Sequence, residues 1–195
     1  MNKWQEFIVS TKLGFFILVD AGDNDVHKIR EELLQIDEII LVHCLIGPDD
    51  LICYGEASSL AALKEVVTFK LAHLIEDKFN PISHTQTSLS LEYFGEQLTA
   101  ESHGHPTNTA AWILADINIS GAINISERLL SKHPEIKSAH ALLGSHDTLF
   151  YVEADDLDRL MEVIDDGVRI LRGIGNEGKS VKALSRTDTR LVLMK

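Results

Sequence analysis

The sequence predicts a mixed α+β protein made of two tandem βαββαβ units. Three observations predict this class: the chain repeats itself, each copy shows the same succession of short apolar runs and amphipathic segments, and the composition is that of a folded protein. Of the 195 residues, 45% are hydrophobic and 25% are charged. These fractions are ordinary for a globular chain and argue against disorder.

The repeat is clearest in residues 43–57, which align with residues 140–154 at a constant offset of 97, with seven of the 15 positions identical. Residues 85–91, TQTSLSL, likewise match residues 187–193, TDTRLVL. Such self-similarity indicates a tandem duplication. We therefore expect a first repeat at residues 1–92 and a second at 109–195. The segment between them, 93–108, is rich in small and polar residues and is expected to be a linker.

The first repeat begins with an apolar run of strand length at residues 15–21. Residues 25–35 carry apolar side chains at helical spacing behind possible N-caps at Asp23, Asn24 or Asp25, and predict a helix. Residues 39–46 and 51–57 are two short apolar runs separated by Gly47-Pro-Asp-Asp50, which predicts a hairpin.

Residues 60–74 have the periodicity of a second amphipathic helix, and residues 83–91 alternate as a last strand. The order βαββαβ is that of a ferredoxin-like unit, which covers only one face of its sheet with helices. Two units can bury their bare faces together, so we expect an intramolecular pseudo-dimeric α/β barrel. Its antiparallel sheets would lie face to face with the helices outside.

Strand parity places a polar cluster between the predicted sheets. If residue 46 pairs with residue 51, then His43 faces Tyr54 across the hairpin, and in the second repeat His140 faces Tyr151. Glu56 and Glu153 share the same face, whereas Cys44 and Cys53 fall on the helix side. The cluster has three interpretations: a satisfied structural network, a catalytic or metal-binding centre, and a ligand pocket without chemistry.

Composition excludes several other classes. The formal net charge of −12 argues against binding of duplex DNA, which needs clustered Lys and Arg. No apolar stretch is long enough to span a bilayer, and residues 1–6 begin neither a signal peptide nor a lipidation motif, so we expect a cytoplasmic protein without membrane contact. The two cysteines lack metal-site spacing, and His103 and His105 lack a third ligand nearby. We predict no metal and no cofactor.

The two hairpin turns have features that suit an amino acid ligand. Gly47 and Gly144 allow close approach to the main chain, and the carboxylates of Asp50 and Asp147 can accept hydrogen bonds from an ammonium group. Glycine and aspartate are also the commonest turn residues for purely local reasons. Both interpretations stay open on the sequence alone.

The strand, Gly-x-x-Asp turn, strand and helix, followed by the Thr-x-Thr-x-Leu-x-Leu strand, resemble the effector-binding (RAM) domain of Lrp/AsnC-type regulators, a dimeric α/β-barrel family. Both repeats fit the pattern, but the residues before the first strand are too few for the family's helix-turn-helix domain. The resemblance implies transcription regulation and a pocket for an amino acid or similar effector. Position by position, it implies ligand contacts from Gly47, Asp50, Thr85, Thr87, Gly144, Asp147, Thr187 and Thr189.

Two functions therefore follow from the sequence. The first is a non-catalytic module that binds an amino acid or related metabolite and acts through assembly or a partner protein, without binding nucleic acid directly. Exposed edges at the last strands favour a homo-oligomer. The alternative is a small α/β-barrel enzyme, similar to cofactor-independent monooxygenases or to haem- and tetrapyrrole-handling proteins. It would use His43, Tyr54, Glu56, His140, Tyr151 and Glu153.

Overall fold

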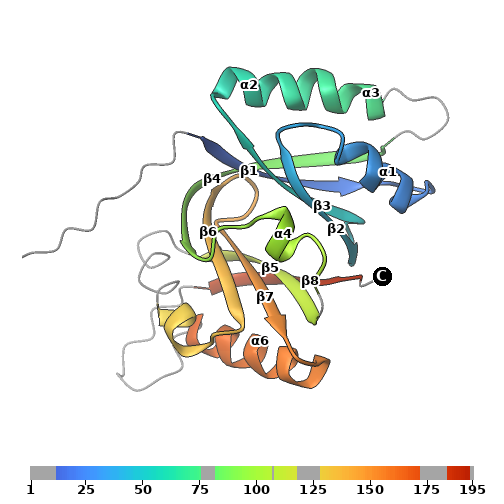
Figure 1. Cartoon of the computed structure of the whole chain (residues 1–195). Helices are drawn as coiled ribbons and strands as arrows, with labels where there is room; N and C mark the ends of the chain where they lie inside the picture. The colour runs from blue at the N-terminus through green and yellow to red at the C-terminus, as the bar shows by residue number, and fades with distance from the viewer. Residues whose placement is uncertain (1–11, 76–81, 107, 118–127, 172–183, 194–195) are drawn as a thin grey trace, which may run out of the picture.

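The protein folds as a mixed α+β structure around a closed, eight-stranded antiparallel barrel (Figure 1). The computed structural model describes residues 12–75, 82–106, 108–117, 128–171 and 184–193. The α+β class predicted from the sequence is confirmed. The strands are β1 (Leu13–Asp20), β2 (Ile39–Ile46), β3 (Leu51–Ala57), β4 (His84–Gly95), β5 (Thr109–Ile117), β6 (Ile136–Leu143), β7 (Thr148–Ala154) and β8 (Leu184–Val192).

The barrel is closed by strand pairs that join the two halves of the chain. The order within the first half is β4-β1-β3-β2, and the order within the second is β8-β5-β7-β6. Strand β2 pairs with β8 through Leu45 and Val192, and β4 pairs with β6 through Leu89 and Leu143. Strands β4 and β8 therefore have a neighbour on each side. The expectation of exposed edges at these last strands was wrong, because the two halves use those edges to pair with each other.

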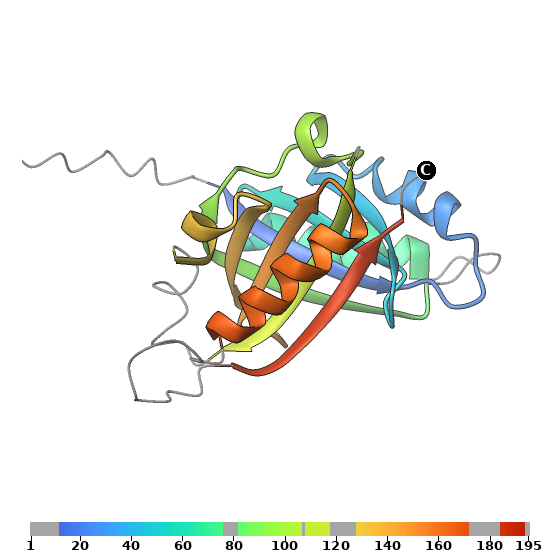
Figure 2. The same ribbon diagram turned by 90° about the horizontal axis from the view of Figure 1, so that it is seen from below.

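Helices cover the barrel on two opposite sides (Figures 1 and 2). The first half contributes α1 (Val26–Leu33), α2 (Leu60–Glu65) and α3 (Leu71–Ile75), and the π-helical turn η1 (Val66–Lys70) joins α2 to α3. The second half contributes α6 (Leu157–Leu171), and residues 128–132 are also helical. Of the three candidate caps before α1, Asp25 is the one used: its side chain accepts hydrogen bonds from the backbone N–H groups of His27 and Lys28.

Three apolar clusters hold this arrangement together. One lies between the first half's sheet and its helices and includes Phe15, Ile17 and Leu33, and the equivalent cluster under α6 includes Phe150 and Val163. The third fills the barrel interior with side chains from both halves, and its members alternate along each strand with those of the outer clusters. Strands β1, β2, β3, β5 and β7 therefore have two buried faces, which explains their nearly continuous apolar sequences, whereas β4 and β8 are more polar and more exposed.

The segment between the halves is more structured than a linker. Strand β4 continues to Gly95, which has φ = 91° and whose added Cβ would collide with the carbonyl oxygen of Lys137. A short helix, α4 (Ala100–His103), follows, and the side chain of Thr99 accepts a hydrogen bond from the backbone N–H of Ser102 at its start. In Figure 1, α4 lies between the helical layers of the two halves.

The hairpin register differs from the predicted one by two residues. His43 lies opposite Ile52 and Leu41 lies opposite Tyr54, because the backbone N–H of Leu45 bonds to the carbonyl of Asp50 and leaves a four-residue loop. The second hairpin is the same, with His140 opposite Leu149 and Ser138 opposite Tyr151. A shift of two residues preserves the face that each side chain occupies. The histidines and tyrosines accordingly point into the barrel, and Cys44 and Cys53 point toward the helices.

Within the described residues, no helix has both the length and the apolar composition needed to cross a bilayer. Residues 1–6, on which the expectation of no leader sequence was based, lie outside the described part of the chain.

Candidate functional site

His43 is held in the barrel interior by both of its ring nitrogens. The indole N–H of Trp112 donates to Nδ1 at 3.0 Å, so the ring proton lies on Nε2, which donates to the carbonyl oxygen of His103 at 2.6 Å. The side chain is 2% exposed. Burial, reinforced by the positive groups of Arg30 and neighbouring histidines, lowers the pKa of His43 from 6.5 to about 4. The imidazole is therefore neutral near pH 7 and has no nitrogen available for catalysis.

His140 occupies the related position in the second half and is also buried. Its Nδ1 lies 3.0 Å from the hydroxyl of Ser90, and burial lowers the pKa of the ring to about 3. Its Nε2 and the hydroxyl of Ser138 are buried without a hydrogen-bond partner among the described residues. Phe16, Tyr54 and other rings pack around His140.

The two tyrosines predicted to face these histidines are tied to glutamates on their own strands. The hydroxyl of Tyr54 donates to Glu56 Oε1 at 3.2 Å, and that of Tyr151 donates to Glu153 Oε1 at 2.6 Å. Burial together with the adjacent carboxylates raises the pKa of both phenols well above the usual value. Trp112 packs against Tyr151 with ring centroids 4.5 Å apart. This packing supports the structural interpretation of the inner cluster over the catalytic one.

The first predicted turn site is occupied by internal contacts. The carboxylate of Asp50 accepts a hydrogen bond from the backbone N–H of Ala21 at 2.7 Å. Asp49 accepts one from Arg190 Nε at 3.1 Å, across the β2–β8 seam. The side chain of Arg190 lies so close to Gly47 that a Cβ at this position would collide with it. Glycine is required here because a side chain from the other half approaches the turn.

The second turn follows the same plan with different partners. A Cβ on Gly144 would collide with the hydroxyl of Ser88 on β4, so this turn also packs against the last strand of the other half. His146 Nδ1 lies 2.9 Å from Asp116 Oδ1. The backbone N–H of Asp147 donates to the carbonyl of Ala115.

The four predicted threonines lie on the outer face of the barrel. Thr85 and Thr87 pair with Val19 and Ile17, whose side chains belong to the cluster beneath the first half's helices. Thr187 and Thr189 occupy the equivalent positions on β8, opposite Ala115 and Ile113. Ser88 and Arg190, which meet the turn glycines, pair with residues of the inner cluster instead. The threonines and the residues that contact the glycines thus lie on opposite faces of β4 and β8.

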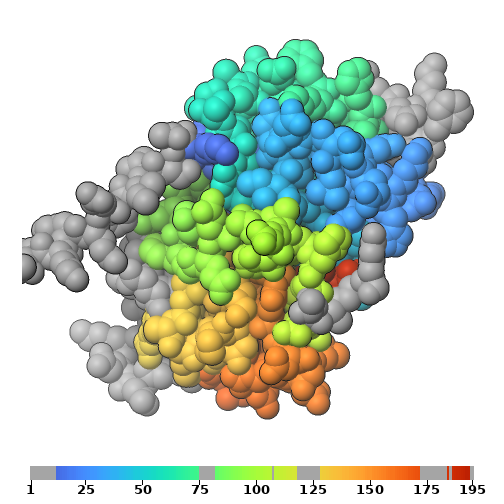
Figure 3. Space-filling model, in the orientation of Figure 1, coloured from blue at the N-terminus to red at the C-terminus, as the bar shows by residue number. Residues whose placement is uncertain are grey.

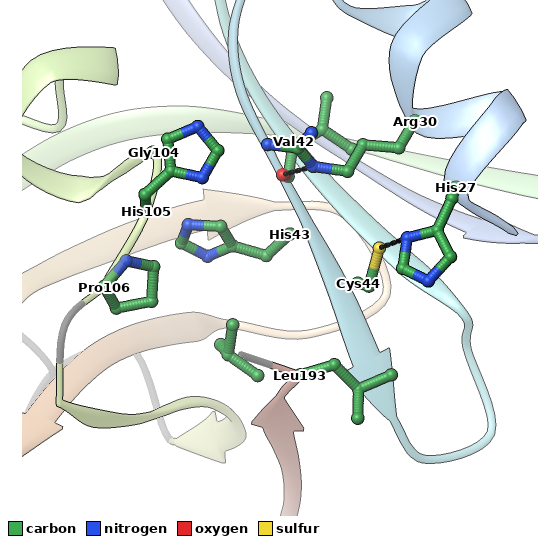
Figure 4. Close-up of a pocket in the computed structure, with 10 residues that line it drawn as sticks. His27, Arg30, Val42, His43, Cys44, Gly104, His105, Pro106 and Leu193 are labelled. Atoms are coloured by element: carbon green, nitrogen blue, oxygen red, sulfur yellow. Dashed lines mark hydrogen bonds between the residues drawn. The ribbon is translucent and has the colours of Figure 1, made fainter. Parts of the chain in front are cut away.

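A pocket in the described structure lies elsewhere, along β2 near the end of β8. It has a volume of about 660 Å³, within the range of roughly 300–1,000 Å³ typical of small-molecule sites. It is formed by α1, β2, the segment after α4, and the end of β8, as Figure 4 shows. In the space-filling view, the same parts of the chain meet where α1, the green segment 100–106 and the red C-terminal strand lie close together (Figure 3). The lining residues are His27, Arg30, Val42, His43, Cys44, Gly104, His105, Pro106, Val192 and Leu193.

Arg30 is the fixed charge of this pocket. It is 6% exposed, its Nε donates to the carbonyl of Val42 at 3.0 Å, and its Nη1 donates to Glu31 Oε1 at 2.8 Å. Glu31 is itself largely exposed and does not line the pocket. His27, on α1, and His105, after α4, are exposed at the pocket wall. No described lining residue is an aspartate or a glutamate.

Three histidines and a cysteine line the pocket, but the structure does not bring them together as a metal centre. No group of three or more His, Cys, Asp or Glu side chains suited to a metal ion occurs among the described residues. A guanidinium in the wall disfavours a cation further. What the arrangement offers is a partly enclosed surface with one guanidinium, also paired with Glu31, two exposed histidine rings and an apolar side, a set of hydrogen-bond donors that suits an anion.

The sequence analysis did not identify Arg30, although its position carried a signal. Val26, Ile29 and Leu33 define the apolar face of α1, and residue 30 lies on the same face, four residues after Val26. An arginine at such a position is buried with a partner or lines a polar cavity. His105 was noted only as an incomplete metal motif, and nothing in the sequence indicated that the segment after α4 would lie against β2.

Comparisons with known proteins support the fold but do not assign a family. No protein-family model matches the chain, and no curated protein is similar to it in sequence. Among solved structures, the siroheme decarboxylase NirDL in complex with an iron-uroporphyrin III analogue matches at 7% identity and a TM-score of 0.65, over 92% of this chain and 70% of that one. An anthrone oxidase-like protein matches at 11% identity and a TM-score of 0.58, over 94% and 91%.

A transcriptional regulator from Neisseria meningitidis in complex with L-Met matches 49% of this chain and 57% of its own length, at 17% identity and a TM-score of 0.36. This likeness is too partial for any conclusion to rest on it. The two longer matches, at such low identities, show that the whole described chain shares its architecture with proteins of different activities. The chain is therefore similar in fold to these two proteins, and the likeness extends to the fold alone.

Proposed function

We propose that this protein is a non-catalytic small-molecule-binding module whose ligand is a small anionic metabolite, and that its site is the pocket along β2. The single observation that carries the proposal is the charge of the lining. The pocket combines Arg30 with two exposed histidines and no described carboxylate, in a chain whose formal net charge is −12. A positive concave surface on an acidic protein attracts and orients anions.

The place of the pocket supports a regulatory role. Its walls come from α1 and β2 of the first half, from Gly104 to Pro106 of the intervening segment, and from Val192 and Leu193 at the end of the second half. A ligand bound there contacts all three parts of the chain, so its binding energy can favour one arrangement of them. Leu193, an apolar residue of the lining, is 46% exposed, and Ile46 at the end of β2 is also an exposed apolar side chain. They support the proposal that the bound state acts through assembly or a partner protein.

The equal strand order of the two halves supports the predicted tandem duplication, and the barrel supports kinship with Lrp/AsnC-type effector domains. We keep the turn residues implied by that resemblance as a proposed second ligand-binding site, weaker than the pocket along β2. The enzymatic alternative is disfavoured by the inner cluster, because His43 is hydrogen-bonded at both nitrogens and both tyrosine hydroxyls donate to glutamates.

A thermal-shift screen tests the proposal. The wild-type protein, Arg30→Gln and the control Arg169→Gln are heated with small carboxylates, phosphate, amino acids, divalent metals and haem. Arg169 is an exposed α6 residue paired with Asp165, and it is not part of the pocket lining. A ligand at a hundred times its Kd stabilises the native state by about 3 kcal/mol, a shift of several degrees for a chain of this size. We expect anions to stabilise the wild type and Arg169→Gln but not Arg30→Gln.

Two results would argue against this function. If no anion raises the melting temperature, the pocket is not an anion site. If only haem or a metal does so, the enzymatic alternative gains support.

A further inference from the structure

The pocket along β2 also contains a basis for choosing among anions, an inference that rests on the proposed function. The lining has two distinct sides. Arg30, His27 and His105 provide hydrogen-bond donors, whereas Val42, Pro106, Val192 and Leu193 provide apolar surface. A ligand that uses both sides has an anionic head and an apolar body.

Three backbone carbonyls in or beside the pocket wall already accept hydrogen bonds. The carbonyl of Val42 accepts from Arg30, and the carbonyl of Cys44 accepts from the backbone N–H of Leu193 at 2.9 Å. The carbonyl of His103, beside the pocket, accepts from His43. The guanidinium of Arg30 is paired with the carboxylate of Glu31. The Glu31 side chain is 61% exposed and lies outside the pocket lining.

This distribution disfavours an ammonium group. A charged amine taken from water into the pocket loses its hydration and meets neither a carboxylate nor an unengaged carbonyl among these described acceptors. It also lies near the positive guanidinium of Arg30, which repels it. The carboxylate of the same molecule gains a charge-assisted contact. The two ends of an amino acid zwitterion therefore have opposite preferences in this pocket.

We propose that the pocket selects small apolar monocarboxylates without an α-ammonium group over the amino acids of the same carbon skeleton. The amino acid predicted from the turn motifs is then the poorer ligand of this pocket, and its 2-oxo or deaminated counterpart is the better one. Arg30 binds the carboxylate, and the wall formed by Val42 and Val192 binds the aliphatic body.

The test is a calorimetric titration at pH 7 with three compounds that share one skeleton: 4-methylpentanoate, 4-methyl-2-oxopentanoate and L-leucine. We expect at least one of the two anions to bind about tenfold or more tightly than L-leucine, since one unfavourable charge contact in a partly enclosed site is worth at least this factor. Arg30→Gln should abolish the preference. His105→Ala, a change at an exposed residue that does not threaten folding, should weaken both anions several-fold, and Arg169→Gln should change neither affinity.

Each alternative result has a separate meaning. Equal or tighter binding of L-leucine overturns the selectivity but leaves anion binding at the pocket in place. If inorganic phosphate binds as tightly as the two carboxylates, the aliphatic body adds no affinity, and the inference that the apolar wall binds it is overturned. Absence of binding by every compound, in a protein with a normal melting transition, overturns both the inference and the proposed function.

Discussion

The indole N–H of Trp112, in the second half of the chain, donates a hydrogen bond to Nδ1 of His43, in the first half, at 3.0 Å inside the barrel. Trp112 has no exposed surface. The same imidazole bonds to the carbonyl of His103 in the segment between the halves. One buried ring thus connects the three parts of the chain, directly behind the wall of the pocket along β2.

Replacing Trp112 should destabilise the protein through this bond. In Trp112→Phe, Nδ1 of His43 stays buried without a donor and part of the indole volume becomes a cavity, so we expect a loss of about 2–4 kcal/mol in the free energy of unfolding. Chemical denaturation measures it. The double variant with His43→Leu isolates the bond, because the unsatisfied nitrogen is then absent. Purely additive effects of the two changes would contradict the coupling.

Stability should fall with pH below the ordinary pKa of histidine. The pKa values of His43 and His140 drop from 6.5 to about 4 and about 3 on folding. Between these values and 6.5, the unfolded chain binds protons that the native state does not, so the free energy of unfolding rises with pH. The contribution is fully present above pH 6.5 and is lost as the pH falls toward 4 and then 3. For His43 it is about 3 kcal/mol.

Denaturation midpoints measured from pH 7 to pH 4.5 test this behaviour. In His43→Gln, the free energy of unfolding should depend less steeply on pH, because this variant lacks one of the two titrating rings. An unchanged slope in that variant would mean that His43 is accessible to protons in the native state.

Because Gly47 and Arg190 are in contact, we expect substitutions at these two positions to have strongly non-additive effects on the free energy of unfolding. Gly47→Ala places a Cβ against the arginine side chain, and overpacking of this kind costs about 1–3 kcal/mol. In an Arg190→Ala background the same change should cost much less, as a double-mutant cycle by urea denaturation would show. Gly167→Ala in α6 is the matched control, since its Cβ would meet Leu129 at an ordinary 3.8 Å. Equal costs in the two backgrounds would contradict this packing.

The turn aspartates should affect stability rather than the pocket. In Asp50→Ala, the buried N–H of Ala21 loses its acceptor, which costs about 1–3 kcal/mol. Both Asp50→Ala and Asp147→Ala should bind 4-methylpentanoate with the wild-type affinity, measured by calorimetry below the melting transition. Loss of binding in either variant would shift the site from the pocket along β2 to the turns.

Local sequence patterns predicted β2 and β3 well because both faces of these strands are buried. Strands β2 and β3 have the predicted bounds, 39–46 and 51–57, since the apolar runs end sharply at the turn residues. Their register was predicted two residues off, because it depends on the Leu45–Asp50 bond and on an irregularity after Ile39. The helix predicted at 60–74 contains a π-helical turn at Val66–Lys70, which apolar periodicity does not distinguish from an α-helix.

The pocket could not be predicted in the same way. Its lining combines α1, β2, residues 104–106 and the end of β8, which come together only after the two halves close the barrel through β2 and β8. The sequence pattern within one repeat does not indicate how the two repeats pair to close the barrel. Among the lining residues, Arg30 alone carried an unused signal, since it is a charged residue on an apolar helix face.

The most direct test of the central claim is to locate the bound anion by histidine-selective NMR. The chain has nine histidines, whose ring signals can be assigned with single His→Gln variants. On titration with 4-methylpentanoate, we expect the signals of His27 and His105 to move together and saturably, while those of His133 and His146, which lie outside the pocket lining, stay in place. Saturable movement of His146 without His27 or His105 would contradict the assignment of the site to the pocket along β2.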